Sequence, residues 1–144
     1  MRQKDTWLLQ SNKLLYVDQT MSEDLKAQLI SLEFKPAHAE AYISARGRCE
    51  YCGADLIRNR LAYAGLQIDH IRPSGGEEAS NLALSCAICN SVKSNWLPDE
   101  EAQLDRAELM LAIRRYIKDK AEKHDKLWIE VNKVLRDKWW EADA

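Results

Sequence analysis

The stretch CEYCGADLIRNRLAYAGLQIDHIRPSGGEEASNLALSCAICN, residues 49–90, decides the fold, because it contains all four cysteines of the chain. They form two CxxC pairs, Cys49 with Cys52 and Cys86 with Cys89, and 33 residues separate the pairs. This spacing is typical of a tetrahedral four-cysteine zinc site in which each pair forms one knuckle. The sequence therefore predicts a zinc ion at the centre of the domain.

Two disulfides or a redox-active dithiol are the alternatives to zinc. Both are disfavoured in a chain with no recognisable export signal and no thioredoxin-like βαβ pattern. Four bound thiolates leave no open position on the ion, so the predicted metal is structural rather than catalytic. We expect it to hold residue 50 next to residue 88. Because zinc binding contributes to folding, loss of any one cysteine is expected to unfold the central region.

Two short apolar runs between the cysteine pairs predict a pair of β-strands. The runs LQIDHI (66–71) and NLALSC (81–86) are joined by RPSGGEEAS, and this pattern is typical of strand, loop and strand. Asp69 and His70 fall late on the first strand, where neighbouring side chains point to opposite faces. Asn81 opens the second strand, and a short helix after it is expected to include Asn90 and Lys93.

Helical patterns precede the central region. Residues Thr20 to Glu23 have the spacing of a capping box, and apolar residues recur at helical intervals after them. This helix should end before Pro36, since the residue before a proline is biased away from helical geometry. A second short helix is predicted from Pro36 to Ala45, and we expect it to stop at Gly47.

Helical patterns also follow the central region. Two amphipathic helices are predicted there, split near His124 and Asp125, and their apolar stripes are interpreted as core or partner-facing surface. The Trp139–Trp140 pair is a candidate docking surface, and WLLQSNKLLYV (7–17) fits either a strand or a helix. We expect one compact α+β domain with an N-terminal helical segment (1–46), a central region (47–97) and a C-terminal helical segment (98–144).

The composition is that of one globular domain, with 144 residues and a hydrophobic fraction of 46%. Its formal charge of -2 argues weakly against independent, tight binding to DNA, because nucleic-acid-binding domains usually carry a positive excess. Residues 43–97 hold six basic and five acidic residues, so a local basic groove stays open. The N-terminus has no apolar signal-peptide core, and no apolar run reaches the ~20 residues of a membrane span. We expect a cytoplasmic protein.

The central region resembles an HNH endonuclease of the zinc-knuckle kind. The resemblance rests on CEYC, IDHIRPSGG, SNL, CAICN and Lys93, and it covers residues 47–97. It implies a small ββα-metal (His-Me finger) core, flanked here by N- and C-terminal α-helices. Asp69 would bind a catalytic divalent ion, His70 would be the general base, and Asn81 would orient the histidine and its loop. Asn90 occupies the third signature position, which is often histidine in the family.

An Asp/Asn oxygen pair favours a hard cation, so Mg²⁺ or Mn²⁺ is the expected catalytic ion. The resemblance implies hydrolysis of DNA to 5′-phosphate and 3′-hydroxyl ends. Arg72 and Lys93 are expected to contact phosphate beside the cleaved bond. Arg58 and Arg60 either follow a DNA backbone or belong to a solvated loop.

Two other functions stay open. A non-catalytic zinc-knuckle module could bind nucleic acid or a protein, although binding alone requires none of Asp69, His70 and Asn90. The chain could also be the nuclease subunit of a restriction or phage-defence assembly, in which a protein partner brings it to DNA.

Overall fold

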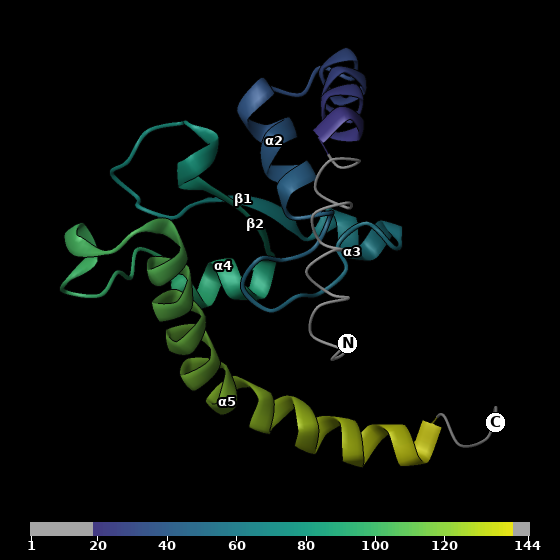
Figure 1. The fold of residues 1–144 in the computed structure, drawn as a ribbon. Helices are drawn as coiled ribbons and strands as arrows, with labels where there is room; N and C mark the ends of the chain where they lie inside the picture. Colours follow the sequence, from purple (N-terminus) through teal and green to yellow (C-terminus); the bar gives the residue numbers. More distant parts are fainter. Residues whose placement is uncertain (1–18, 140–144) are drawn as a thin grey trace, which may run out of the picture.

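A two-stranded antiparallel hairpin forms the centre of the computed structural model, which describes residues 19–139. In Figure 1, helix α2 lies on one side of the hairpin and helix α4 on the other. The α+β fold with a small hairpin-and-helix core is thus confirmed. After a helix over residues 19–31, the elements are α2 (Pro36–Ser44), α3 (Arg60–Ala64), β1 (Leu66–His70), η1 (Ala79–Asn81), β2 (Leu82–Cys86), α4 (Ala87–Lys93), η2 (Glu101–Gln103) and α5 (Arg106–Trp139).

The hairpin confirms the two predicted strands. β1 and β2 pair from Leu66 opposite Cys86 to His70 opposite Leu82. The Ile71 N–H donates to the Asn81 carbonyl at 2.8 Å, which continues the ladder by one bond. Asn81 itself lies in the short 3-10 turn η1, so the prediction that it opens the second strand was one residue early. Neighbouring residues of β2 are buried on both faces, so this strand runs through the core.

The N-terminal helices follow the sequence prediction closely. The first helix ends at residue 31, and α2 starts at Pro36, whose missing N–H costs nothing at a first helical position. The chain leaves α2 through Gly47, where φ is +71°. The capping-box prediction was wrong, because residues 19 and 20 are already helical and Thr20 is not the cap. The ambiguous segment 7–17 lies outside the described residues.

The N-terminal half of α5 supplies most of the helical core. Leu109, Met110, Ile113 and Ile117 are buried in one cluster with β2 and the cysteine pairs. Their spacing of three and four residues places them on one face of the helix. Trp96, just after α4, stacks on Tyr116 with ring centroids 4.1 Å apart and an interplanar angle of 7°. These contacts fasten α4 to α5.

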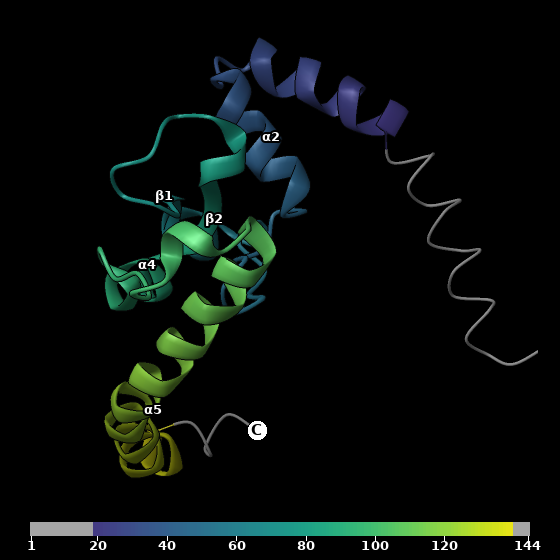
Figure 2. The same ribbon diagram turned by 60° about the vertical axis from the view of Figure 1, so that its left-hand side comes forward.

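The C-terminal region is one helix of 34 residues, so the predicted split near His124 and Asp125 was wrong. Residues 106–139 contain neither glycine nor proline, and charged residues with good helix propensity span the interval between the two apolar patterns. The C-terminal half of α5 extends away from the rest of the protein (Figures 1 and 2). Its apolar side chains are exposed there, Trp128 by 64%, and Trp140 lies outside the described residues.

A short helix that the sequence did not predict, α3, precedes the hairpin. Asn59 caps it by accepting a hydrogen bond from the Ala62 N–H at 2.9 Å. Arg58 precedes this cap and Arg60 is the first helical residue, and both are exposed. The three-part division of the chain, which no observation tests, stays a prediction.

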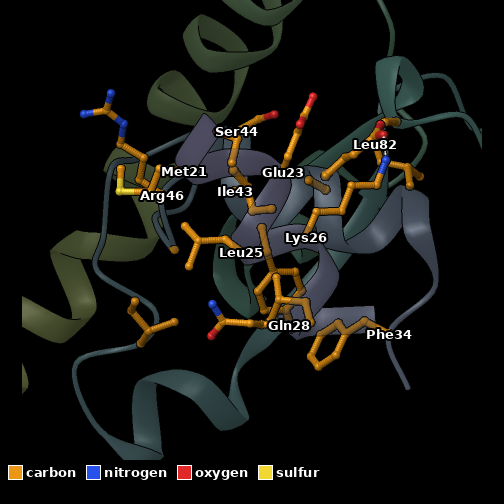
Figure 3. Close-up of a pocket in the computed structure, with 18 of the residues that line it drawn as sticks. Met21, Glu23, Leu25, Lys26, Gln28, Phe34, Ile43, Ser44, Arg46 and Leu82 are labelled. Atoms are coloured by element: carbon orange, nitrogen blue, oxygen red, sulfur yellow. Dashed lines mark hydrogen bonds and ion pairs between the residues drawn. The ribbon is translucent and has the colours of Figure 1, made fainter. Parts of the chain in front are cut away.

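A cavity of about 1450 Å³ lies between the helix over residues 19–31 and α2 (Figure 3). Leu25 and Ile43 are among its mostly apolar lining residues. Asp69, His70 and Asn90 do not line it. Within residues 19–139, no helix combines the length and the apolar character that a membrane crossing needs.

Candidate functional site

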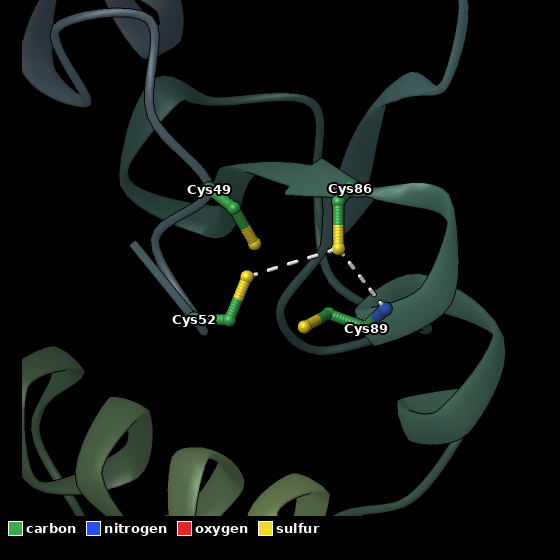
Figure 4. Close-up of side chains that lie close together, drawn as sticks. All are labelled: Cys49, Cys52, Cys86 and Cys89. Atoms are coloured by element: carbon green, nitrogen blue, oxygen red, sulfur yellow. Dashed lines mark hydrogen bonds between the residues drawn. The ribbon is translucent and has the colours of Figure 1, made fainter. Parts of the chain in front are cut away.

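The four cysteine side chains converge on one point (Figure 4). Their Sγ atoms all lie within 4.8 Å of one another, and those of Cys52 and Cys86 are 3.9 Å apart. Zn–S bonds of about 2.3 Å in a tetrahedron require sulfur atoms about 3.8 Å apart. None of the four is in a disulfide, so the arrangement fits zinc and not the disulfide alternative.

Hydrogen bonds around the first cysteine pair join it to the hairpin and to α5. The Glu50 N–H donates to the Leu84 carbonyl at 2.9 Å, and the Leu84 N–H donates to Glu50 Oε2 at 3.2 Å. Arg106 binds the Glu50 carboxylate at 3.1 Å, while Arg114 Nε donates to the Glu50 carbonyl at 2.7 Å. Glu50 is thus held against Leu84 of β2, two residues before Cys86. This position is close to residue 88, beside which residue 50 was expected.

The four thiols share their protons unequally, and metal binding requires all four as thiolates. Hydrogen bonds from Cys52, and then from Cys86 and Cys89, lower the pKa of Cys49 far below the usual thiol value. At Cys86 the hydrogen bond with Cys49 raises the pKa, but those with Cys52 and Cys89 outweigh it and lower the pKa to about 6. The hydrogen bond with Cys49 is the largest cause that raises the pKa of Cys52 and of Cys89, so these two thiols hold protons that a bound cation would displace.

Asp69, the predicted ligand of the catalytic ion, is 7% exposed and has two partners. The Tyr51 hydroxyl donates to Asp69 Oδ2. Lys93 Nζ lies 3.0 Å from Oδ2 and 3.3 Å from Oδ1, and Lys93 also donates to the His70 carbonyl at 3.1 Å. Burial, and then the hydrogen bond to Asp69, raise the pKa of Tyr51, so its hydroxyl stays protonated and is the donor.

Helix α4 lies over the face of β1 from which the Asp69 side chain projects. Gln67 and Asp69 are two residues apart on the strand, so they share this face. Asn90 and Lys93 are three residues apart on α4, so they also share a face. The Asn90 amide nitrogen donates to Gln67, and Lys93 pairs with Asp69. Asp69 and Asn90 are thereby brought to the same side of β1.

Asp69 and Asn90 offer the kinds of donor atom that a hard divalent cation prefers. The contact with Gln67 uses the amide nitrogen of Asn90, so its Oδ1 is the atom that can coordinate. On Asp69, two donors bind Oδ2, whereas Oδ1 has one contact at 3.3 Å. One carboxylate oxygen and one amide oxygen are typical protein ligands of Mg²⁺ or Mn²⁺, which complete their shells with water and phosphate.

His70 faces the loop between the strands. Its Nε2 lies 2.6 Å from Glu77 Oε1, and this hydrogen bond lowers the pKa of Glu77. An ionised carboxylate only accepts hydrogen bonds, so Nε2 is the donor. The lone pair of the neutral ring is then on Nδ1. The contact selects the tautomer that a general base at Nδ1 requires.

Asn81 holds the loop between β1 and β2 in place through side-chain hydrogen bonds. Its Oδ1 accepts from the Arg72 N–H at 2.9 Å, and its Nδ2 donates to the carbonyls of Arg72 and Gly76 at 3.1 and 2.9 Å. A Cβ added to Gly75 would lie 2.5 Å from Asn81 Nδ2, so this position needs glycine. These contacts agree with an orienting role for Asn81, which stays a prediction.

The basic residues predicted to bind phosphate differ in their availability. Lys93 has no exposed surface, and Arg72 donates to the Glu101 carboxylate at 2.8 Å and to the Leu104 carbonyl at 3.0 Å. Both are thus engaged in internal contacts, which count against direct contact with phosphate. Arg58 and Arg60 are exposed, and their contact with DNA stays a prediction.

Three residues that the sequence did not single out contact the predicted site: Gln67, Glu77 and Tyr51. Gln67 lies two residues before Asp69 on β1, so strand alternation could have placed it on the face of Asp69. Glu77 lies in the loop between the strands, seven residues after His70. Tyr51 carried no such signal, because its contact depends on how the first cysteine pair folds against β1.

Residues 49–95 match the family model described as HNH endonuclease. This segment, about a third of the chain, includes both cysteine pairs, the hairpin and α4. Searches of curated proteins and of solved structures gave no significant match. The resemblance noted from the sequence is confirmed for this segment, and it supports a nuclease-type function in general.

The cysteine cluster predicts one zinc ion per chain in protein purified without chelator. Cys89→Ser should lose this zinc and unfold the central region, since metal binding contributes to folding. Elemental analysis and circular dichroism measure the two effects. A metal-free wild type, or a Cys89→Ser variant that keeps both its zinc and its stability, would contradict the zinc site.

The buried ion pair predicts a large cost for Lys93→Met, which leaves the Asp69 charge without its cation. We expect the free energy of unfolding to fall by about 3–5 kcal/mol in urea unfolding of zinc-loaded protein. The matched control is Lys133→Met, which breaks the exposed pair with Glu130 and should cost no more than about 0.5 kcal/mol. Equal, small losses in both variants would show that the buried pair does not form.

Proposed function

We propose that residues 47–97 form a metal-dependent HNH endonuclease that hydrolyses DNA phosphodiester bonds to 5′-phosphate and 3′-hydroxyl ends. The observation that carries the proposal is the position of α4, which brings Asn90 to the face of β1 that holds Asp69. The family match over the same residues supports a nuclease. A zinc-knuckle module that only binds would not need this pair of oxygen ligands.

The catalytic cation would be held by Asp69 Oδ1 and Asn90 Oδ1. When bound, Mg²⁺ or Mn²⁺ supplies stabilisation of the negative charge that develops on the phosphate and the leaving 3′ oxygen. The zinc cluster takes no part in this chemistry, because four thiolates leave it no open position. Its role in the proposal is to hold the loop after Gly47 and the start of α4 in place.

His70 would act as the general base. Glu77 accepts a hydrogen bond from the Nε2–H group of His70. The lone pair on Nδ1 is therefore free to take a proton from the attacking water. A water oxygen–phosphorus bond forms, the bond from phosphorus to the 3′ oxygen breaks, and the leaving oxygen gains a proton from solvent. Asn81 would hold the loop that carries Glu77 through its bonds to Arg72 and Gly76.

A cytoplasmic location and a role as the nuclease subunit of a restriction or phage-defence assembly also belong to this proposal. A described surface that could meet a partner protein is the C-terminal half of α5, with exposed Leu127, Trp128 and Val134. A chain with a formal charge of -2 would benefit from a partner that brings it to DNA. A monomer in light scattering that is fully active alone would exclude this role.

Cleavage of supercoiled plasmid tests the enzymatic proposal. Wild-type protein with Mg²⁺ or Mn²⁺ should nick or linearise the plasmid, and His70→Ala should reduce the rate about 10²–10⁴-fold. His124→Ala removes an exposed histidine of α5 and is the matched control, with a rate like that of the wild type. All three proteins should contain the same amount of zinc.

Other outcomes separate the alternatives. Binding of DNA without cleavage by the wild type in both metals would favour the non-catalytic module. Cleavage that is equal in wild type and His70→Ala would exclude His70 as the base. Cleavage that begins only when a lysate protein is added back would support the subunit role.

A further inference from the structure

Tyr51 links the zinc cluster directly to Asp69. It lies between Cys49 and Cys52 in the first cysteine pair, and its side chain is 7% exposed within the core cluster. Its hydroxyl donates to Asp69 Oδ2. Tyr51 thus belongs to the loop that carries two predicted zinc ligands, Cys49 and Cys52. It also contacts the Asp69 carboxylate, which is proposed to bind the catalytic cation.

The backbone of the loop that carries Tyr51 is held by contacts that do not involve Asp69. Cys49 and Cys52, on either side of Tyr51, belong to the four-thiol cluster. The preceding residue, Glu50, is bonded to Leu84 of β2 and to Arg114 of α5. Cys49 N–H also donates to the Ala54 carbonyl at 2.9 Å, which closes the loop. The Tyr51 hydroxyl is therefore carried by a loop whose backbone is held by several hydrogen bonds.

The Asp69 carboxylate has a distinct donor arrangement on each oxygen. Oδ2 accepts from Tyr51 and lies 3.0 Å from Lys93 Nζ, whereas Oδ1 lies 3.3 Å from the same Nζ. If the Tyr51 bond is removed, Lys93 remains as the described side-chain donor to the carboxylate, which can then turn to bring Oδ1 closer to Nζ. Tyr51 thus keeps Oδ2 occupied and leaves Oδ1 to coordinate.

We propose that Tyr51 is a positioning residue that orients the Asp69 carboxylate toward the catalytic divalent cation, so that the zinc-bound loop sets the affinity of the second metal site. This inference rests on the proposed function, because it requires Asp69 to bind that cation. Partners that orient metal ligands typically change metal affinity or activity 10–100-fold when they are removed.

Tyr51→Phe removes only the hydroxyl and tests the inference on the full, zinc-loaded chain. Free Mn²⁺ is measured by electron paramagnetic resonance during titration, which gives a dissociation constant without any assay of cleavage. We expect Mn²⁺ to bind Tyr51→Phe about 10–100-fold more weakly than the wild type. The Mn²⁺ concentration for half-maximal plasmid cleavage should rise by the same factor, with most of the rate regained at saturation.

The matched control is Tyr42→Phe. Tyr42 is half-buried, its ring packs edge-to-face against Phe34, and it lines the cavity beside α2 rather than the site. This variant should bind Mn²⁺ like the wild type. Zinc content and thermal unfolding are measured on both variants, so a general loss of folding is recognised.

Asp69→Asn separates failure of the inference from failure of the proposed function. Tight Mn²⁺ binding that is lost in Asp69→Asn but unchanged in Tyr51→Phe would overturn the inference and leave the proposed function standing. Mn²⁺ binding that is absent in the wild type, or unaffected by Asp69→Asn, would overturn both. Loss of zinc from Tyr51→Phe would show a role inside the zinc loop and would also overturn the inference.

Discussion

Four thiols within 4.8 Å of one another hold together two chain segments that are 33 residues apart in sequence. The first segment is the loop after Gly47, and the second joins β2 to α4. A hairpin of two five-residue strands is too small to be stable alone, so it requires this cluster and the buried face of α5. Because the cluster fixes the start of α4, it also determines which residues of that helix lie over β1.

The buried contacts of Asp69 show how this arrangement extends to the candidate site. Lys93 has no exposed surface, and a buried ion pair is tolerated only where further hydrogen bonds offset the cost of removing two charges from water. Tyr51 and the His70 carbonyl supply those bonds. Lys93, which was expected to contact phosphate, is therefore a buried cation that neutralises Asp69 and holds the end of β1 through the His70 carbonyl.

Much of this fold could be predicted from sequence, where local patterns carried the information. The cysteine spacing, the two apolar runs and Pro36 are local patterns, and the cysteine cluster, the hairpin and α2 appear where expected. The predicted break in α5 failed because a polar interval between two apolar patterns does not break a helix that lacks glycine and proline. Contacts of Tyr51 and Lys93 with Asp69 depend on tertiary packing, and no periodicity in the sequence reports them.

The most direct measurement is anomalous diffraction from crystals of the zinc-loaded protein soaked in Mn²⁺, with data at both metal edges. We predict a zinc peak among the four Sγ atoms and a separate manganese peak between Asp69 Oδ1 and Asn90 Oδ1. Tyr51 should still donate to Asp69 Oδ2 in that structure. A manganese peak elsewhere, or none while Asp69 keeps both oxygens on Lys93, would contradict the two-metal arrangement.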